Sequence, residues 1–237
     1  MSARYLVVGG SSGIGLELVK TLSASGNEVL VFSRTWEHGL LDRVQHQTFN
    51  VVDDDPSQLS LPDSLNGMAY CPGSINLKSI RALTLETVRA DFELNVIGAV
   101  KVVQAVIKSL KSGANQSGTT SSILFYSTVA VGQGIPMHAS VAASKGAIEG
   151  LTRSIAADLS PQIRANCIAP ALTKTPLAQA FFSSEEKAAK LAQMYPLGRT
   201  GVASDIAEMS AFLLGPKSSW LTGQVIGIDG GMSSIKK

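Results

Sequence analysis

The stretch VVGGSSGIGLELVK, residues 7–20, decides the fold. It joins a short apolar run to a segment of helical period through a loop that contains Gly9, Gly13 and Gly15. Glycines let the backbone turn tightly and approach a pyrophosphate closely, and the helix N-terminus that follows directs unpaired N–H groups at it. The position of the loop, after a first strand and before a helix, predicts a dinucleotide-binding site. Its candidate cofactor-binding residues are Gly9, Ser11, Ser12, Gly13, Ile14 and Gly15.

Outward from this loop, short runs rich in valine, isoleucine and leucine alternate with longer segments of helical period. Strands are expected at RYLVVG (4–9), EVLVFS (28–33), QTFNVV (47–52), GMAYC (67–71), SSILFYS (121–127), IRANCIA (163–169) and QVIGID (224–229). Helices are expected over 16–25, 85–110, 139–158 and 205–214. This alternation predicts an α/β fold, a Rossmann-type doubly wound parallel sheet of about seven strands.

The chain length fits one domain, and no linker divides it, so residues 1–237 are expected to form a single NAD(P)-binding domain. The low-complexity stretch SGANQSGTTSS, residues 112–122, is expected to be a surface loop. Pro56, Pro62 and Gly67 fall between the third and fourth predicted strands. Any crossover helix there should therefore be small or irregular.

Charge and composition narrow the partners. The chain has 20 basic and 18 acidic residues without a run of like charges, which argues against nucleic-acid or membrane binding and favours a small-molecule substrate. A hydrophobic content of 45% suits buried parallel strands and a subunit interface. Cys71 and Cys167 lie far apart in apolar surroundings, typical of a reduced protein. Because neither a signal peptide nor a membrane-spanning run is evident, we expect a soluble, cytoplasmic protein.

Several segments carry a family resemblance. They are the Gly-x-x-x-Gly-x-Gly loop, LNVIGAV (94–100), ASKGAIEGLTRSIAADL (143–159), IRANCIAPALTKTPL (163–177), YPLGRTGVASDIAEMSAFLL (195–214) and WLTGQVIGIDGGM (220–232). In this order they resemble the short-chain dehydrogenase/reductase family over essentially the whole chain. The resemblance implies a single Rossmann-type domain, a nicotinamide cofactor and a homo-oligomer, a tetramer or a dimer.

The end of the second predicted strand bears on the choice of cofactor. A carboxylate there would bind a ribose 2′-hydroxyl and repel a 2′-phosphate, but the chain has Ser33 and Arg34. A hydroxyl and a guanidinium suit a phosphate dianion, which favours NADP(H) over NAD(H). The alternative is that Arg34 is an ordinary solvated loop residue. By the resemblance, Asn50 and Val51, closing the third strand, lie where the family holds the adenine ring.

Two further segments correspond to cofactor contacts of the family. YCPGS, residues 70–74, replaces the usual Asn-Asn-Ala-Gly stretch, so that Cys71 and Gly73 are expected beside the cofactor. After the predicted sixth strand, the residues that match contacts to the nicotinamide amide and phosphates are Pro170, Thr173 and Thr175. Ala171 stands in place of the usual glycine.

The resemblance also assigns the catalytic positions, which in the family hold an Asn, a Ser, a Tyr and a Lys. Asn95 and Lys145 match the first and last. The family's serine lies thirteen residues before its tyrosine, which corresponds to Thr128; Ser127 is the neighbouring alternative, since strand residues alternate in direction. The tyrosine position, four residues before Lys145, holds Val141, which has no proton to give.

Three sources of the missing proton remain open. His138 lies three residues before Val141 on the same face of a continuing helix, and an imidazole suits proton transfer near neutral pH. Tyr126 shares a strand face with Thr128 but lies deeper. The third possibility is a lysine-bound water, or no acid at all.

These residues lead to competing functions. The first is an NADP(H)-dependent oxidoreductase for an unidentified carbonyl or alcohol, with an altered proton donor. The second is a non-catalytic NADP(H)-binding sensor or partner subunit, and a third is an isomerase or lyase that uses the cofactor transiently. Residues 174–198 resemble the family's substrate lid. Its apolar inner surface would come from Phe181, Phe182, Met194 and Tyr195, which fit an interface or the core equally well.

Overall fold

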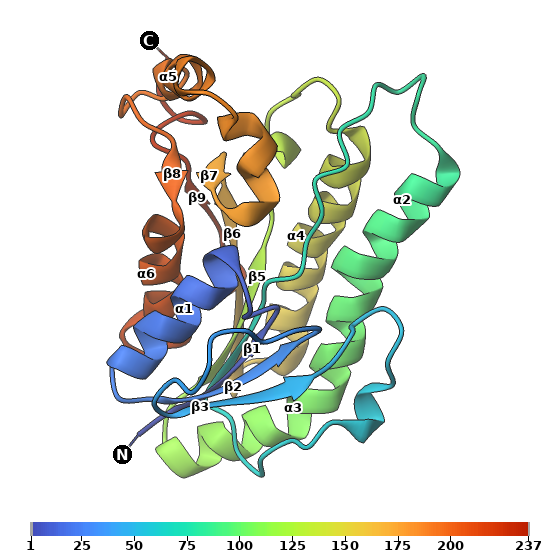
Figure 1. The fold of residues 1–237 in the computed structure, drawn as a ribbon. Helices are drawn as coiled ribbons and strands as arrows, with labels where there is room; N and C mark the ends of the chain where they lie inside the picture. Colours follow the sequence, from blue (N-terminus) through green and yellow to red (C-terminus); the bar gives the residue numbers. More distant parts are fainter. Residues whose placement is uncertain (1, 237) are drawn as a thin grey trace.

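The computed structural model describes residues 2–236, which form a seven-stranded, all-parallel sheet in the order β3-β2-β1-β4-β5-β6-β9 (Figure 1). Its strands are β1 (Arg4–Val8), β2 (Glu28–Ser33), β3 (Val44–Thr48), β4 (Gly67–Tyr70), β5 (Ser121–Tyr126), β6 (Ile163–Pro170) and β9 (Val225–Ile228). A small second sheet pairs β7 (Thr173–Lys174) with β8 (Gly201–Val202). The predicted doubly wound Rossmann-type sheet is confirmed.

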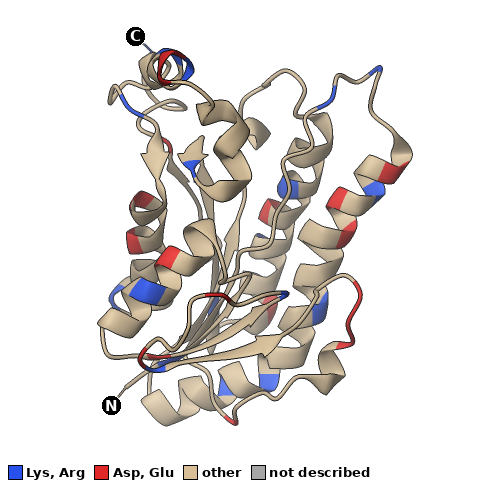
Figure 2. Ribbon diagram, in the orientation of Figure 1, with Lys and Arg blue, Asp and Glu red and all other residues tan. Residues whose placement is uncertain are grey.

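Helices cover both faces of the sheet (Figure 1). One face carries α1 (Gly13–Ala24) and α6 (Ala203–Leu214), and the other carries α3 (Gly98–Ser117) and α4 (Ala139–Leu159). The remaining helices are α2 (Leu85–Phe92), which packs on α4, and α5 (Glu185–Gln193). Figure 2 shows basic and acidic residues intermixed along the helices and loops. Within the described residues, every helix is too short or too polar to span a bilayer.

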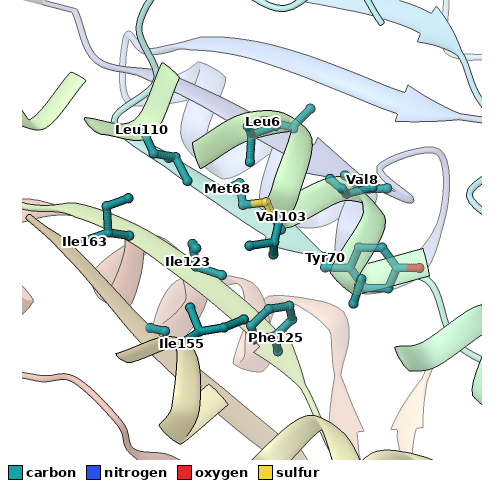
Figure 3. Close-up of a cluster of buried hydrophobic side chains, with 14 of the residues drawn as sticks. Leu6, Val8, Met68, Tyr70, Val103, Leu110, Ile123, Phe125, Ile155 and Ile163 are labelled. Atoms are coloured by element: carbon teal, nitrogen blue, oxygen red, sulfur yellow. The ribbon is translucent and has the colours of Figure 1, made fainter. Parts of the chain in front are cut away.

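The core consists of two layers separated by the sheet. Figure 3 shows side chains of the sheet, among them Leu6, Met68 and Ile123, directed toward Val103 and Leu110 of α3. Alternate strand residues form the second layer against α1 and α6. Because both faces are covered, β1 from Tyr5 onward and the whole of β4 are apolar rather than alternating with polar residues.

The third strand lies earlier than predicted. β3 ends at Thr48, which pairs with Ser33, so the expectation that Asn50 and Val51 close a strand is wrong. Asn50 instead begins a turn, in which its N–H donates to Asp54 Oδ2 at 2.7 Å and its Oδ1 accepts from the N–H of Val52 at 3.1 Å. These local side-chain bonds compete with the sheet ladder and stop the strand.

The expected loop over 112–122 is also wrong in most of its length. Helix α3 continues to Ser117 and β5 begins at Ser121. Only residues 118–120 connect them, with Gly118 in the left-handed conformation (φ 65°) that commonly ends a helix. The helix persists because Gly113 and Ala114 are buried against the segment before β4.

Two expectations about irregular structure have different outcomes. The crossover between β3 and β4 contains a single 3-10 turn, Pro56–Gln58, as its proline and glycine residues predict. The helix expected over 85–110 forms without a break, but it contains a π-helical turn, Glu93–Ile97, between α2 and α3. Such turns often occur at functional sites. This one contains Asn95, which is fully buried.

Candidate active site

The site lies where the sheet changes direction. From β1 the chain adds β2 and β3 on one side, whereas β4, β5 and β6 follow on the other. In open α/β sheets, ligands bind at the carboxyl ends of the strands at this switch point. The loops after β1 and β4 touch there, since a Cβ placed on Gly9 would lie 3.0 Å from the nitrogen of Pro72.

The glycine loop has the geometry of an anion cradle. Gly9 and Gly13 have φ angles of 76° and 54°, a region that side-chain-bearing residues rarely adopt. A Cβ on Gly15 would lie 2.3 Å from the carbonyl oxygen of Gly9, so only glycine fits. Ser12, the N-cap of α1, makes no side-chain bond to the helix N–H groups, which leaves first-turn donors without a protein cap.

Three predicted site residues meet at this edge. A Cβ placed on Gly73 would lie 3.5 Å from Lys145 Nζ and 3.7 Å from Asn95 Oδ1. The amide of Asn95 donates to Ser144 Oγ at 3.1 Å, which orients its oxygen. That oxygen is buried and has no hydrogen-bond partner among the described residues. A buried acceptor without a partner beside a lysine marks a place for a bound donor.

Lys145 is only 8% exposed. Burial lowers its pKa to about 8, while the Asp91 carboxylate acts in the opposite direction. Burial also raises the pKa of each of the two thiols to about 12, so both are protonated at neutral pH. Both cysteines are free, as expected for two cysteines that lie far apart in the sequence.

A buried carboxylate, Asp91, is the residue that sequence reasoning missed. It is fully buried in α2 and accepts from Ser74 Oγ at 2.5 Å, Asn76 Nδ2 at 2.6 Å and Ser140 Oγ at 2.5 Å. It therefore joins the segment after β4 to the first turn of α4. An acid four residues before Asn95 on the inner face of a predicted helix was the available signal.

The two candidate hydroxyls after β5 have different partners. Ser127 is buried and donates to Glu149 Oε1 at 2.6 Å. Thr128 is half-buried, and its Oγ1 accepts from the N–H of Ala130 at 3.3 Å, while its proton has no partner in the part of the chain that the structure describes. The free hydroxyl is thus that of Thr128, the residue expected to hold the substrate oxygen.

The structure separates the possible proton donors. Tyr126 donates to Ser210 Oγ at 2.8 Å and is buried in the core under α6, so its hydroxyl is already used. His138 is half-buried at the N-cap of α4, with Nδ1 2.8 Å from the carbonyl oxygen of Pro136. Because a carbonyl only accepts, Nδ1 carries a proton and Nε2 remains available. Val141 is buried, one turn before Lys145.

The remaining predicted cofactor residues lie at the same edge or close to it. Thr175 packs on the glycine loop, since a Cβ placed on Gly13 would lie 3.3 Å from the Cβ of Thr175. Pro170 ends β6, and Thr173 Oγ1 donates to the carbonyl oxygen of Ala171 at 3.0 Å. Cys71 continues β4, with its N–H donating to the carbonyl oxygen of Val8 at 2.9 Å.

The expected lid residues divide between surface and core. The segment contains the 3-10 helix Pro176–Phe182 and helix α5, both in orange at the upper edge in Figure 1. Tyr195 is buried, so it belongs to the core, whereas Met194 is 58% exposed. Phe181 and Phe182 are not buried in the core.

The strand order and the helices on both faces define a doubly wound, Rossmann-type α/β protein. Residues 60–233 match the family model described as enoyl-(acyl carrier protein) reductase. The chain is 30% identical to L-xylulose reductase of Bos taurus, over 96% of this chain and 95% of that protein. It therefore belongs to the short-chain dehydrogenase/reductase family.

Solved structures agree with this assignment. A short-chain dehydrogenase family protein of Francisella tularensis superposes with a TM-score of 0.89 at 26% identity, covering 99% of this chain and all of the other. A variant of actinorhodin polyketide ketoreductase, solved with NADPH, superposes with a TM-score of 0.87 at 25% identity, covering 99% of this chain and 98% of the other. The relatives named here are oxidoreductases by name or by family.

Proposed function

We propose that this chain is an NADP(H)-dependent oxidoreductase that acts on a carbonyl or alcohol and uses an altered proton donor. The observation that carries the proposal is the meeting of Lys145, Asn95 and Gly73 at the switch point of the sheet. A purely structural protein has no need to bury a lysine beside an amide oxygen that lacks a partner.

The residues present fit a nicotinamide dinucleotide. The glycine loop would hold the pyrophosphate with its free first-turn N–H groups, and Lys145 would hold the ribose on the nicotinamide side. The bound cofactor supplies or accepts the hydride. Gly73 leaves room beside Lys145, and Thr175, packed on Gly13, would close the phosphate side.

Preference for NADP(H) rests on the end of β2. Arg34 is exposed and makes no ion pair or hydrogen bond within residues 2–236. A guanidinium available at this position suits a 2′-phosphate, because it offers paired donors and a permanent charge. The structural relative solved with NADPH supports the same cofactor.

For the substrate, Thr128 and His138 are the proposed contacts. The free hydroxyl proton of Thr128 would be donated to the substrate oxygen, where negative charge develops. His138 would give up its Nε2 proton as the imidazolium, while Nδ1 stays bonded to Pro136. Lys145 would supply a positive charge beside the reacting groups, and Asn95 would supply a polar acceptor.

A titration followed by turnover tests this function. We expect NADPH to bind and to be consumed in the presence of a panel of ketones and quinones. His138→Ala should lower turnover by on the order of a hundredfold, since an acid is lost, with NADPH affinity unchanged. Lys108→Ala, a substitution at an exposed position of α3, is the control and should change neither quantity. Absence of nucleotide binding would overturn the proposal.

The pH profile provides a separate prediction. Lys145 is charged below and neutral above a pKa of about 8, so turnover should fall as the pH rises through that value. In Lys145→Arg the guanidinium keeps its charge, so the fall centred near pH 8 should disappear even if the maximal rate is lower, whereas any fall caused by loss of the proposed His138 acid should remain. Lys108→Arg, the same exchange on an exposed face of α3, should leave the profile unchanged. A fall centred near pH 8 that persists in Lys145→Arg would assign it to another group.

The second candidate is a non-catalytic NADP(H)-binding sensor or partner subunit. Buried Val141 favours it, because the position that carries the acid in the family is apolar. Nucleotide binding without turnover of any substrate, in wild type, would identify this function. The two candidates share the cofactor site and differ only in the proton donor.

Three organisational proposals accompany the function. Residues 174–198 form the substrate lid of a single domain. The chain assembles as a homo-oligomer, a tetramer or a dimer, and the almost fully exposed Trp220, together with Phe212 at 40% exposure, supports a subunit contact. Two free thiols support a reducing, cytoplasmic location.

A further inference from the structure

The loop between β2 and β3 contains no helix or strand, but specific side-chain contacts hold it in place. We call residues 34–41 the strap. Trp36 stacks on His46 of β3, with ring centroids 5.6 Å apart and planes 17° apart. Its Nε1–H donates to the carbonyl oxygen of Gly39 at 2.9 Å, which closes a turn. The strap is therefore anchored to the sheet by an aromatic stack.

The side chain of His38 connects the strap to the glycine loop. Its ring stands edge-on to Trp36, with centroids 5.1 Å apart at 84°. Its Nε2 lies 2.7 Å from the carbonyl oxygen of Ser11. Since a carbonyl only accepts, Nε2 carries the proton, and Nδ1 is left for another partner.

The hydroxyl of Ser33, in contrast, already has hydrogen-bond partners within the protein. Its hydroxyl donates to the carbonyl oxygen of Thr35 at 2.8 Å, and His46 Nε2 lies 3.0 Å from Ser33 Oγ and 3.2 Å from its carbonyl oxygen. The expectation that Ser33 donates to a phosphate does not fit this arrangement. Arg34 remains, and a phosphate dianion normally takes several charged donors.

We propose that His38 is a second 2′-phosphate-binding residue beside Arg34, held in place by Trp36, and that the strap selects NADP(H) over NAD(H). The proposal rests on the proposed cofactor. The register supports the placement, because the N–H of Gly9 donates to the carbonyl oxygen of Phe32 at 2.7 Å, which sets the end of β2 beside the glycine loop.

Because Nε2 donates to the carbonyl oxygen of Ser11, Nδ1 can donate to a phosphate only when the ring is the imidazolium. The other charged or titratable groups around it are Arg34 and Glu37 in the strap and His46 on β3; residues 9–15 of the glycine loop have none. A neutral His38 would present a lone pair to the phosphate, so the proposed contact depends on the charged ring.

Binding constants for NADPH and NADH, measured with His38→Gln, test the proposal. We expect the Kd for NADPH to rise about tenfold or more, the size of a lost charge-assisted bond, and the Kd for NADH to change by less than about twofold.

Trp36 is a positioning residue and has its own readout. Trp36→Ala should weaken NADPH binding and spare NADH, whereas Trp36→Phe, which keeps a stacking ring, should restore most of the affinity. Unchanged NADPH affinity in His38→Gln would overturn the role of His38 and leave the proposed function intact. Failure of wild type to bind either nucleotide would instead overturn the proposed function.

Discussion

In the His138→Ala background, Val141→Tyr should raise the rate of carbonyl reduction by on the order of a hundredfold to ten-thousandfold, the usual contribution of a positioned general acid. Position 141 lies one turn before Lys145 on α4, so a phenol there would share its helix face. The lysine's charge would favour the phenolate and make the phenol a better proton donor. Initial rates of NADPH consumption with a ketone panel provide the measurement.

Val141→Phe is the matched control, because it adds the same ring without the hydroxyl. Val141 is only 6% exposed, so both variants must place an aromatic ring where a small side chain packs, and both share any cost of overpacking. A gain in Val141→Tyr alone identifies the hydroxyl as the cause. Equal rates in the two variants would contradict the role assigned to this position.

Making Val141→Tyr in both wild type and His138→Ala distinguishes the two proposed functions. If His138 is the natural acid, its loss should matter in wild type and matter little once the phenol introduced by Val141→Tyr supplies the proton. If wild type shows no turnover and Val141→Tyr does, the natural protein is a nucleotide-binding relative with an otherwise intact site. Each result selects one of the two functions.

Gly113→Ala should destabilise the protein by about 1–3 kcal/mol or more, although alanine favours helices. A Cβ on Gly113 would lie 2.0 Å from the carbonyl oxygen of Leu65 and 2.6 Å from its carbon, both backbone atoms. Helix α3 or the segment before β4 must therefore shift. For a chain of this size, thermal unfolding should show Tm lower by about 2–4 °C per kcal/mol.

Gly150→Ala is the matched control for this helix glycine. Gly150 is exposed in the middle of α4, and nothing lies within 4 Å of a Cβ placed there. The same substitution should raise stability by about 0.5–1 kcal/mol through helix propensity. If both variants lost stability equally, the contact with Leu65 would not be the cause.

Prediction from the sequence was most successful where local pattern and periodicity are strong. The glycine loop, the apolar strands and the long helix with Lys145 appear at the expected positions, because buried parallel strands and amphipathic helices leave a direct signature. It failed at 112–122, where small polar residues resemble a loop. Gly113 is buried there by contact with Leu65, a residue far away in the chain.

The candidate site divides in the same way. Asn95, Lys145 and Gly73 could be named from motifs, but their meeting depends on the switch in strand order and on the π-helical turn. Only the tertiary structure shows that Asp91 accepts three hydrogen bonds and that the hydroxyl of Ser33 is bonded to Thr35 and His46. Hydrogen-bond partners come from separate elements, so no local pattern records them.

By itself, the sequence determined a doubly wound, Rossmann-type fold of the short-chain dehydrogenase/reductase family, and it predicts that Val141 stands where the family has its tyrosine. These are properties of residue identity and spacing. Only the tertiary structure decided which polar groups remain available within residues 2–236, among them Asn95 Oδ1, Arg34, His38 Nδ1 and the hydroxyl proton of Thr128. The physical reason is that each hydroxyl, amide or imidazole has few donors and acceptors, and folding assigns most of them to partners distant in sequence.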